Sequence, residues 1–178
     1  MKPQARVLAV DDSPFVKGID EYTSLIGILF RGLILEKVLK ARIEVDGDDA
    51  EDKIVDMVLS LNGEVRLLFL HGTTFGGFNT VRIDRIHDRI GIPVISFLET
   101  PPGEDRVVRA LSKMDREDKI KDFLSQPKFV EFNTKHGPLY CSFVGLDKVE
   151  VARLIENFSI ESKMPEQLRI ADMFASVL

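Results

Sequence analysis

Two short apolar runs limit the folds that this chain can adopt. Leu25–Phe30 is apolar throughout, and Val65–Leu70 is apolar except at Arg66. A strand with one face in water alternates apolar and polar residues, so a continuous apolar run is typical of a strand buried on both faces. We therefore predict a sheet that other elements cover on both sides.

Further strands precede and separate these two runs. Arg6–Val10 is β-prone and ends at the turn residues Asp11–Pro14. Leu39–Val45 alternates apolar and charged residues, which is typical of a strand near the edge of a sheet. The links between the first three predicted strands are short, which favours antiparallel neighbours.

The rest of the chain alternates helical and extended patterns. The apolar residues from Ala50 to Leu61 recur at helical spacing. The other predicted helices are one that ends at Ile90, Arg106–Met114, Arg116–Leu124, Lys148–Asn157 and Glu166–Val177, and the other predicted strands are Val94–Leu98, Phe129–Phe132 and Leu139–Val144. This order indicates an α/β fold with a mixed sheet and helices on both faces. With 178 residues and no repeat or linker, we expect a single domain, residues 1–178.

Composition excludes several classes of protein. One cysteine, Cys141, cannot form a disulfide framework or a zinc ribbon. The first apolar run is too short for a signal peptide, and no apolar stretch reaches the roughly 18–20 residues that cross a bilayer. We expect a soluble, cytoplasmic protein with no membrane partner. The net charge of −5 argues against a nucleic-acid binder driven by overall charge, but leaves a local basic face open.

Three aspartates and one histidine are candidate site residues because of their places along the predicted elements. Asp11 ends the first strand, His71 ends the Val65–Leu70 strand, Asp49 precedes a helix, and Asp172 lies on the last helix. Ligands of α/β sheets bind beyond the carboxyl ends of the parallel strands, so Asp11 and His71 can share one crevice if their strands are neighbours. Converging carboxylates bind a divalent cation, which can activate water for phosphodiester cleavage. Taken singly, such acidic residues more often cap helices or stabilise turns.

Five segments in order carry a family resemblance: Val7–Asp11, Leu67–Asn79 with its run HGTTFGGFN, Gly91–Ile95, Pro138–Ser142 and Pro165–Asp172. In these segments the chain resembles the endonuclease V-like branch of the RNase H-like superfamily. More narrowly, it is similar to a largely archaeal family defined by a domain of unknown function, number ninety-nine. The resemblance implies a three-layer α/β/α fold around a five-stranded core sheet.

The resemblance also implies a metal site. Asp11 matches the metal-binding aspartate of the first strand, Asp49 lies near the acidic residue that begins the first helix, and Asp172 matches the polar position of the closing helix. His71 stands where these families carry aspartate, which replaces an oxygen ligand by nitrogen. The implied function is a Mg²⁺- or Mn²⁺-dependent endonuclease with Asp11, Asp49 and Asp172 as catalytic carboxylates and all four residues around the metal.

Two departures from endonuclease V favour a different function. Its catalytic lysine falls near Glu99, a reversal of charge, and its Tyr-Ile-Pro-Gly wedge is replaced by Ala41–Val45. One alternative is therefore a protein that binds DNA or RNA without cleaving it. Another is a protein-interaction module, with a homodimer formed through the edge of the third strand.

The glycine-rich loop after His71 is a candidate substrate contact. Gly72, Gly76 and Gly77 let the backbone approach a phosphate or adopt a positive φ, and Thr73 lies among them. The alternative is a tight turn between a strand and a helix, anchored by the phenylalanines within Phe75–Phe78.

Arg82 extends this candidate surface onto the next helix. Arg82, Arg85 and Arg89 follow one face of that helix, where they can neutralise phosphates. Asp84 and Asp88 lie close by, so an ordinary solvated face with salt bridges is the alternative.

Overall fold

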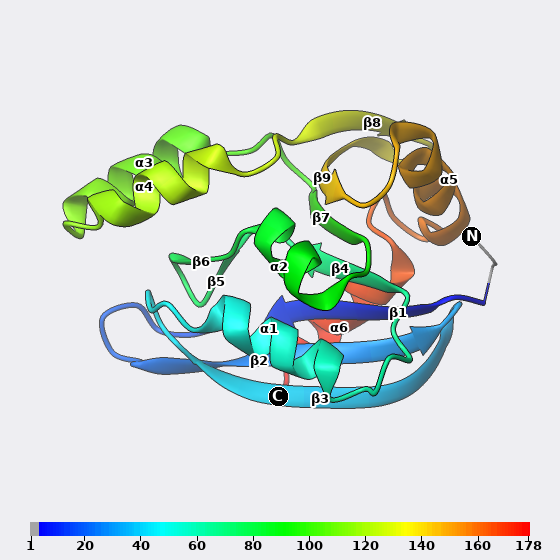
Figure 1. The fold of residues 1–178 in the computed structure, drawn as a ribbon, viewed down its shortest axis with the longest axis horizontal. Helices are drawn as coiled ribbons and strands as arrows, with labels where there is room; N and C mark the ends of the chain where they lie inside the picture. The colour runs from blue at the N-terminus through cyan, green and yellow to red at the C-terminus, as the bar shows by residue number, and fades with distance from the viewer. Residues whose placement is uncertain (1–3) are drawn as a thin grey trace.

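The computed structural model describes residues 4–178 and is built around one large sheet (Figure 1). The strands are β1 Arg6–Asp12, β2 Tyr22–Arg31, β3 Ile34–Glu44, β4 Leu67–His71, β5 Thr74–Phe75, β6 Asn79–Thr80, β7 Val94–Leu98, β8 Val130–Thr134 and β9 Gly137–Val144. Seven of them form the main sheet in the order β3-β2-β1-β4-β7-β9-β8, and β5 pairs with β6 in a small hairpin.

The centre of the main sheet is parallel and its two sides are antiparallel. β1, β4 and β7 run parallel to one another. β2 and β3 extend the sheet as antiparallel strands on one side, and β9 and β8 do so on the other. The expected five-stranded core consists of β3, β2, β1, β4 and β7, and β9 and β8 extend the sheet to seven strands.

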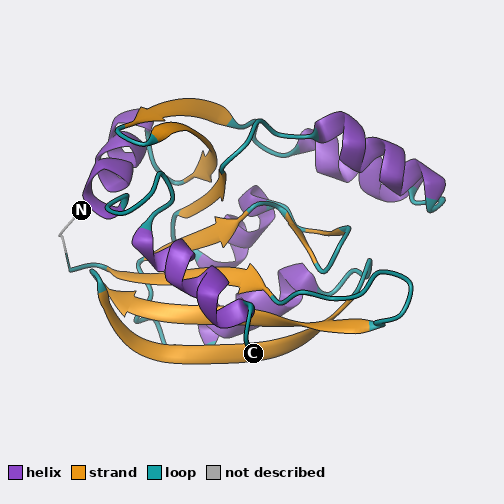
Figure 2. Ribbon diagram, turned by 180° about the vertical axis from the view of Figure 1, so that it is seen from behind, coloured by secondary structure: helices purple, strands orange, loops and turns teal. Residues whose placement is uncertain are grey.

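The helices complete three layers. They are α1 Ala50–Leu59, α2 Ile83–Ile90, α3 Glu104–Lys113, α4 Glu117–Ser125, α5 Lys148–Phe158 and α6 Glu166–Ala175. Helices α1 and α2 pack on one face of the sheet, and α5 and α6 pack on the other (Figures 1 and 2). The predicted α/β/α architecture with a mixed sheet is therefore confirmed.

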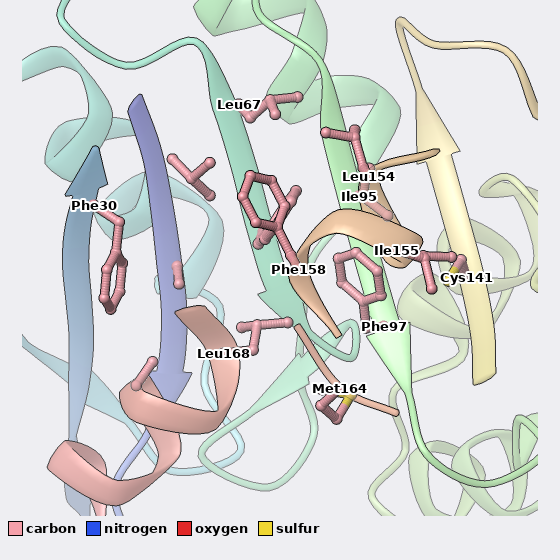
Figure 3. Packing of buried hydrophobic residues seen from close by; sticks show 14 of the residues in the cluster. Phe30, Leu67, Ile95, Phe97, Cys141, Leu154, Ile155, Phe158, Met164 and Leu168 are labelled. Carbon is pink, nitrogen blue, oxygen red and sulfur yellow. The ribbon is translucent and has the colours of Figure 1, made fainter. Parts of the chain in front are cut away.

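The apolar run in β2 is buried on both faces because its alternate residues enter different cores. Phe30 (Figure 3), Ile26 and Ile28 pack in the core under α5 and α6, whereas Leu25 and Leu29 pack under α1. Burial of one such side chain stabilises the fold by about 1.5–3 kcal/mol. The two apolar layers therefore account for the position of this strand inside the sheet.

The β2–β3 hairpin is longer than the sequence pattern predicts. β3 begins at Ile34 instead of Leu39, because the two strands pair down to a tight turn at Gly32–Leu33. Gly32 has a φ of 63°, a conformation that favours glycine. β3 is one of the two edge strands of the main sheet, as expected, and most of its side chains are exposed.

Helices α3 and α4 form a helical arm, residues 104–125, that extends away from the sheet (Figure 1). The arm has a small core that consists of Val107, Leu111 and Phe123, and Phe78 of the main body packs against this core. Between residues 4 and 178, no helix has both the length and the apolar character that crossing a membrane requires.

Candidate active site

Asp11 and His71 meet because β1 and β4 are parallel neighbours. Val10 lies opposite Leu70 in the register, so the next residue of each strand reaches the same edge of the sheet. Nδ1 of His71 lies 2.8 Å from Oδ2 of Asp11. The predicted meeting of these two side chains at the carboxyl ends of the strands is confirmed.

Asp172 reaches the same point from α6. This helix packs against β1 and β2 through a buried face that includes Leu168, Ala171 and Ala175. Asp172 lies at the margin of that face, and one potential ligand atom from each of Asp11, His71 and Asp172 lies within 4.8 Å of the other two. We call these three residues the acidic cluster.

The acidic cluster favours a positive charge. Asp11 is only 4% exposed. Burial alone lowers the pKa of His71, but the hydrogen bond to Asp11 and the negative charges of Asp11, Asp172 and Glu99 raise it above its ordinary value. The same negative field that raises this pKa attracts a metal cation to this point.

The donor set of the acidic cluster fits a divalent cation. Two carboxylates and an imidazole combine hard oxygen ligands with a nitrogen that Mn²⁺ and Zn²⁺ accept readily. Mg²⁺ binds more weakly to nitrogen and is held chiefly by carboxylates and water. The chemistry of the three side chains therefore matches a metal site, with Asp11 as its most buried ligand.

Asp12 has a different role from Asp11. Its Oδ2 accepts a hydrogen bond of 2.7 Å from the backbone N–H of Gly76. Burial raises the pKa of Asp12 to about 6, although this hydrogen bond opposes the shift. Asp12 thus ties the glycine-rich loop to the end of β1, a role that the Asp-Asp pair in the sequence did not reveal.

The glycine-rich loop divides into two parts. Gly72 and Thr73 line a cleft that contains the acidic cluster. Gly76 and Gly77 are not among the described residues that form its walls. At Gly77 the φ is +86°, and a Cβ atom would lie 2.3 Å from Oδ1 of Asp46. The second part of the loop is therefore the packed turn that sequence analysis gave as the alternative.

The structure places Asp49 away from the acidic cluster. Its Oδ1 accepts hydrogen bonds from the backbone N–H of Glu44, at 3.1 Å, and from Nδ2 of Asn79, at 2.8 Å. Among the described residues, 4–178, the potential metal ligands that lie close together are Asp11, His71 and Asp172, and Asp49 is not one of them. Asp49 instead joins the end of β3 to β6, so the structure does not bring it to the other three expected metal ligands.

Arg82 also lies outside the cleft. Its guanidinium pairs with Asp84 and, at 3.0 Å, with Asp122 of α4. Arg85 pairs with Asp122 and with Glu51 of α1. The helix face that carries these arginines is therefore the salt-bridged face that sequence analysis gave as the alternative. Its salt bridges fasten the helical arm to the main body.

The cleft has a volume of about 490 Å³ and extends from the acidic cluster to the helical arm. Its apolar wall includes Leu98, Val107, Phe123 and Phe129. Helical periodicity predicted the two helices of the arm but not their contact with the site. The amphipathic pattern of a helix indicates that one face is buried, without specifying which element covers it.

Comparisons with known proteins show the family of this chain and the fold that it shares. The model of the family described as endonuclease dU matches residues 3–178. A UPF0215 protein of Nanoarchaeum equitans is 35% identical over 187 residues, covering 98% of this chain and 88% of the relative. Most of this chain is therefore comparable with most of that protein.

Two solved structures share the fold. A protein of unknown function from Archaeoglobus fulgidus is similar with a TM-score of 0.83 and 28% identity, over 96% of both chains. Endonuclease V of Ciona intestinalis, solved with DNA that contains inosine, is similar with a TM-score of 0.58 and 12% identity, over 96% of this chain and 84% of the other. Because the family model matches nearly its whole length, the chain belongs to the endonuclease dU family.

Proposed function

We propose that this protein is a divalent-metal-dependent endonuclease that cleaves nucleic acid at deoxyuridine. The observation that carries the proposal is the convergence of Asp11, His71 and Asp172 in one cleft. The description of the family supports cleavage at deoxyuridine. The likeness to an endonuclease V solved with DNA supports a nucleic-acid substrate.

Each member of the acidic cluster has a distinct part in this function. A bound divalent cation supplies an activated water and stabilises the leaving oxygen of a phosphodiester. Asp11 is buried and would bind the metal while orienting His71 through Nδ1. This hydrogen bond leaves Nε2 of His71 to act as a ligand or to hold a proton. Asp172 is exposed and would complete the shell from the open side.

The rest of the cleft positions the substrate. Gly72 has a φ of +79°, and it lies with Thr73 at the wall beside His71. A backbone without a Cβ at Gly72 lets a substrate strand come close to the acidic cluster. Asp12 and Asp46 hold the remainder of the loop in place by hydrogen bonds from the N–H groups of Gly76 and Phe78.

A cleavage assay with matched variants tests the proposal. The wild type with Mn²⁺ or Mg²⁺ should cut labelled DNA strands that contain one deoxyuridine, and Asp11→Asn should lower the rate by at least about a hundredfold. Asp56→Asn replaces an exposed aspartate of α1 and should retain the wild-type rate.

The same assay separates the proposal from its alternative. If no DNA or RNA strand is cut with either metal, although the protein binds those strands, then it is a nucleic-acid-binding protein without nuclease chemistry. Equal cleavage by the wild type and by a folded Asp11→Asn variant would place the active site elsewhere.

A further inference from the structure

A buried amide lies in the wall of the cleft that contains the acidic cluster. Gln126 follows the last residue of α4 and is 7% exposed. Its Nε2 lies 3.4 Å from Oγ1 of Thr73, another wall residue, which is 5% exposed. Its Oε1 has no hydrogen-bond partner in the described part of the chain, residues 4–178.

An unpaired buried acceptor requires an explanation, because nearly all buried polar atoms in proteins form hydrogen bonds. Gln167 of α6 also has an unpaired Oε1, but its Nε2 donates to the carbonyl of Gly32 at 2.7 Å. That amide fastens α6 to the β2–β3 turn. Gln126 has only a long contact with Thr73, and it lies in the wall of a cleft, so a bound molecule can supply the missing partner.

The surroundings of Gln126 suit a flat ring. The wall of the cleft is apolar at Leu98, Val107, Phe123 and Phe129. Enzymes that act on a base extrude it into a pocket with apolar or aromatic walls and read its Watson–Crick edge by hydrogen bonds. The volume of about 490 Å³ lies in the usual range for small-ligand pockets.

We propose that Gln126 and Thr73 form a subsite for a nucleic-acid base with a lactam edge, in which an N–H lies beside a carbonyl. Oε1 of Gln126 would accept from N3–H of uracil, and Nε2 would donate to O4. Because Nε2 of Gln126 donates to Thr73, the orientation of the amide is fixed. In that orientation cytosine would place its unprotonated N3 against Oε1 and its N4 amino group against Nε2, so two acceptors and two donors would face each other. This inference rests on the proposed function and names the residue that distinguishes uracil from cytosine.

Binding without cleavage tests the subsite. Fluorescence anisotropy in Ca²⁺ would compare short single-stranded oligonucleotides that differ at one position, deoxyuridine or deoxycytidine. The wild type should prefer the deoxyuridine strand by roughly 5- to 150-fold, the range expected for one bidentate pair. Thymine presents the same edge as uracil, so this amide should not separate those two bases.

Three variants assign the preference to the amide. Gln126→Met keeps the length of the side chain and should bring the ratio of the two affinities close to one. Thr73→Val removes the hydroxyl that orients the amide, and it should reduce the ratio by at least about threefold. Gln167→Met removes the other buried amide with an unpaired oxygen and should keep the wild-type ratio, with thermal unfolding confirming that each variant is folded.

The possible results distinguish this inference from the proposed function. A wild-type ratio of one, or an unchanged ratio in folded Gln126→Met, would overturn the subsite even if the protein cleaves deoxyuridine DNA. If Gln126→Met fails to fold, an unchanged ratio in Thr73→Val would overturn it. A ratio that depends on Gln126 in a protein that cuts no strand would support the subsite while the nuclease proposal fails.

Discussion

At the scale of single residues, His71 distinguishes this site from one made only of carboxylates. Its imidazole lies close to the buried Asp11 and the exposed Asp172, whose charges attract positive charge. Without metal, the raised pKa of the imidazole favours its charged form, which balances part of the negative charge. An aspartate at this position would add a third negative charge instead, and only a bound cation would balance it.

The variant His71→Asp tests this balance. Without metal, we expect the free energy of unfolding to fall by about 1–3 kcal/mol, since the hydrogen bond to Asp11 is lost and like charges are brought together. Addition of Mg²⁺ should recover more stability in the variant than in the wild type. Urea unfolding in chelator and in Mg²⁺ measures both effects, with His136→Asp on the surface as the control. Equal unfolding midpoints of His71→Asp and wild type in chelator would contradict this account.

A second effect at this scale concerns Gly77. Alanine there would have a strained φ and a Cβ that clashes with Asp46, whereas Gly63 has a similar φ of +75° with open space around it. We expect Gly77→Ala to destabilise the protein by about 2–4 kcal/mol and Gly63→Ala by about 1 kcal/mol. Thermal unfolding of the two variants measures the difference, and equal losses would show that Asp46 does not restrict this loop.

At the scale of elements, the start of α6 determines where Asp172 lies. Glu166 accepts hydrogen bonds from the N–H of Glu161, at 3.1 Å, and from the guanidinium of Arg169, at 2.8 Å. Burial alone would raise the pKa of Glu166, but these partners lower it below its ordinary value of 4.5. An ionised carboxylate in the first turn also suits the helix dipole.

The pH dependence of stability follows from this lowered pKa. Ionised Glu166 stabilises the folded state above the ordinary pKa, and this contribution is lost as the pH falls through the lowered value. We expect Glu166→Gln to destabilise the protein by about 1–2 kcal/mol at neutral pH, and to differ little from wild type in strong acid. Denaturant unfolding at several pH values measures this, and a difference that stays constant into acid would exclude the charge as its cause.

At the scale of the whole molecule, the helical arm is a separate unit with a small core. Arg116 and Lys119 of the arm contact Asp48, and Asp122 pairs with Arg82 and Arg85 of the main body. Few apolar contacts join the arm to the sheet, apart from Phe78. Local opening of the arm should therefore require less free energy than unfolding of the sheet.

Hydrogen exchange tests this difference in stability. Asp48→Asn weakens the contacts with Arg116 and Lys119, so we expect exchange in α3 and α4 to become about threefold to tenfold faster. Exchange in β1 and β4 should stay unchanged, and Asp56→Asn serves as the control. Acceleration throughout the sheet would show that the arm and the main body unfold together.

The sequence predicted the fold and part of the site for identifiable reasons. Asp11 and His71 were predictable because each ends an apolar strand, and parallel neighbours bring strand ends together. Asp172 depended on the family resemblance, since helical periodicity alone does not single out one polar residue. Asp49 was misplaced because its hydrogen bond to Asn79 forms only when β6 folds against the end of β3. Gln126 was missed because its surroundings exist only after the arm packs beside the cleft.

A crystal structure with Mn²⁺, analysed by anomalous scattering, tests the central claim most directly. We expect one strong peak coordinated by oxygen atoms of Asp11 and Asp172 and by a ring nitrogen of His71. An absence of manganese at millimolar concentration, with Asp11 and Asp172 directed to opposite sides of the molecule, would contradict the account.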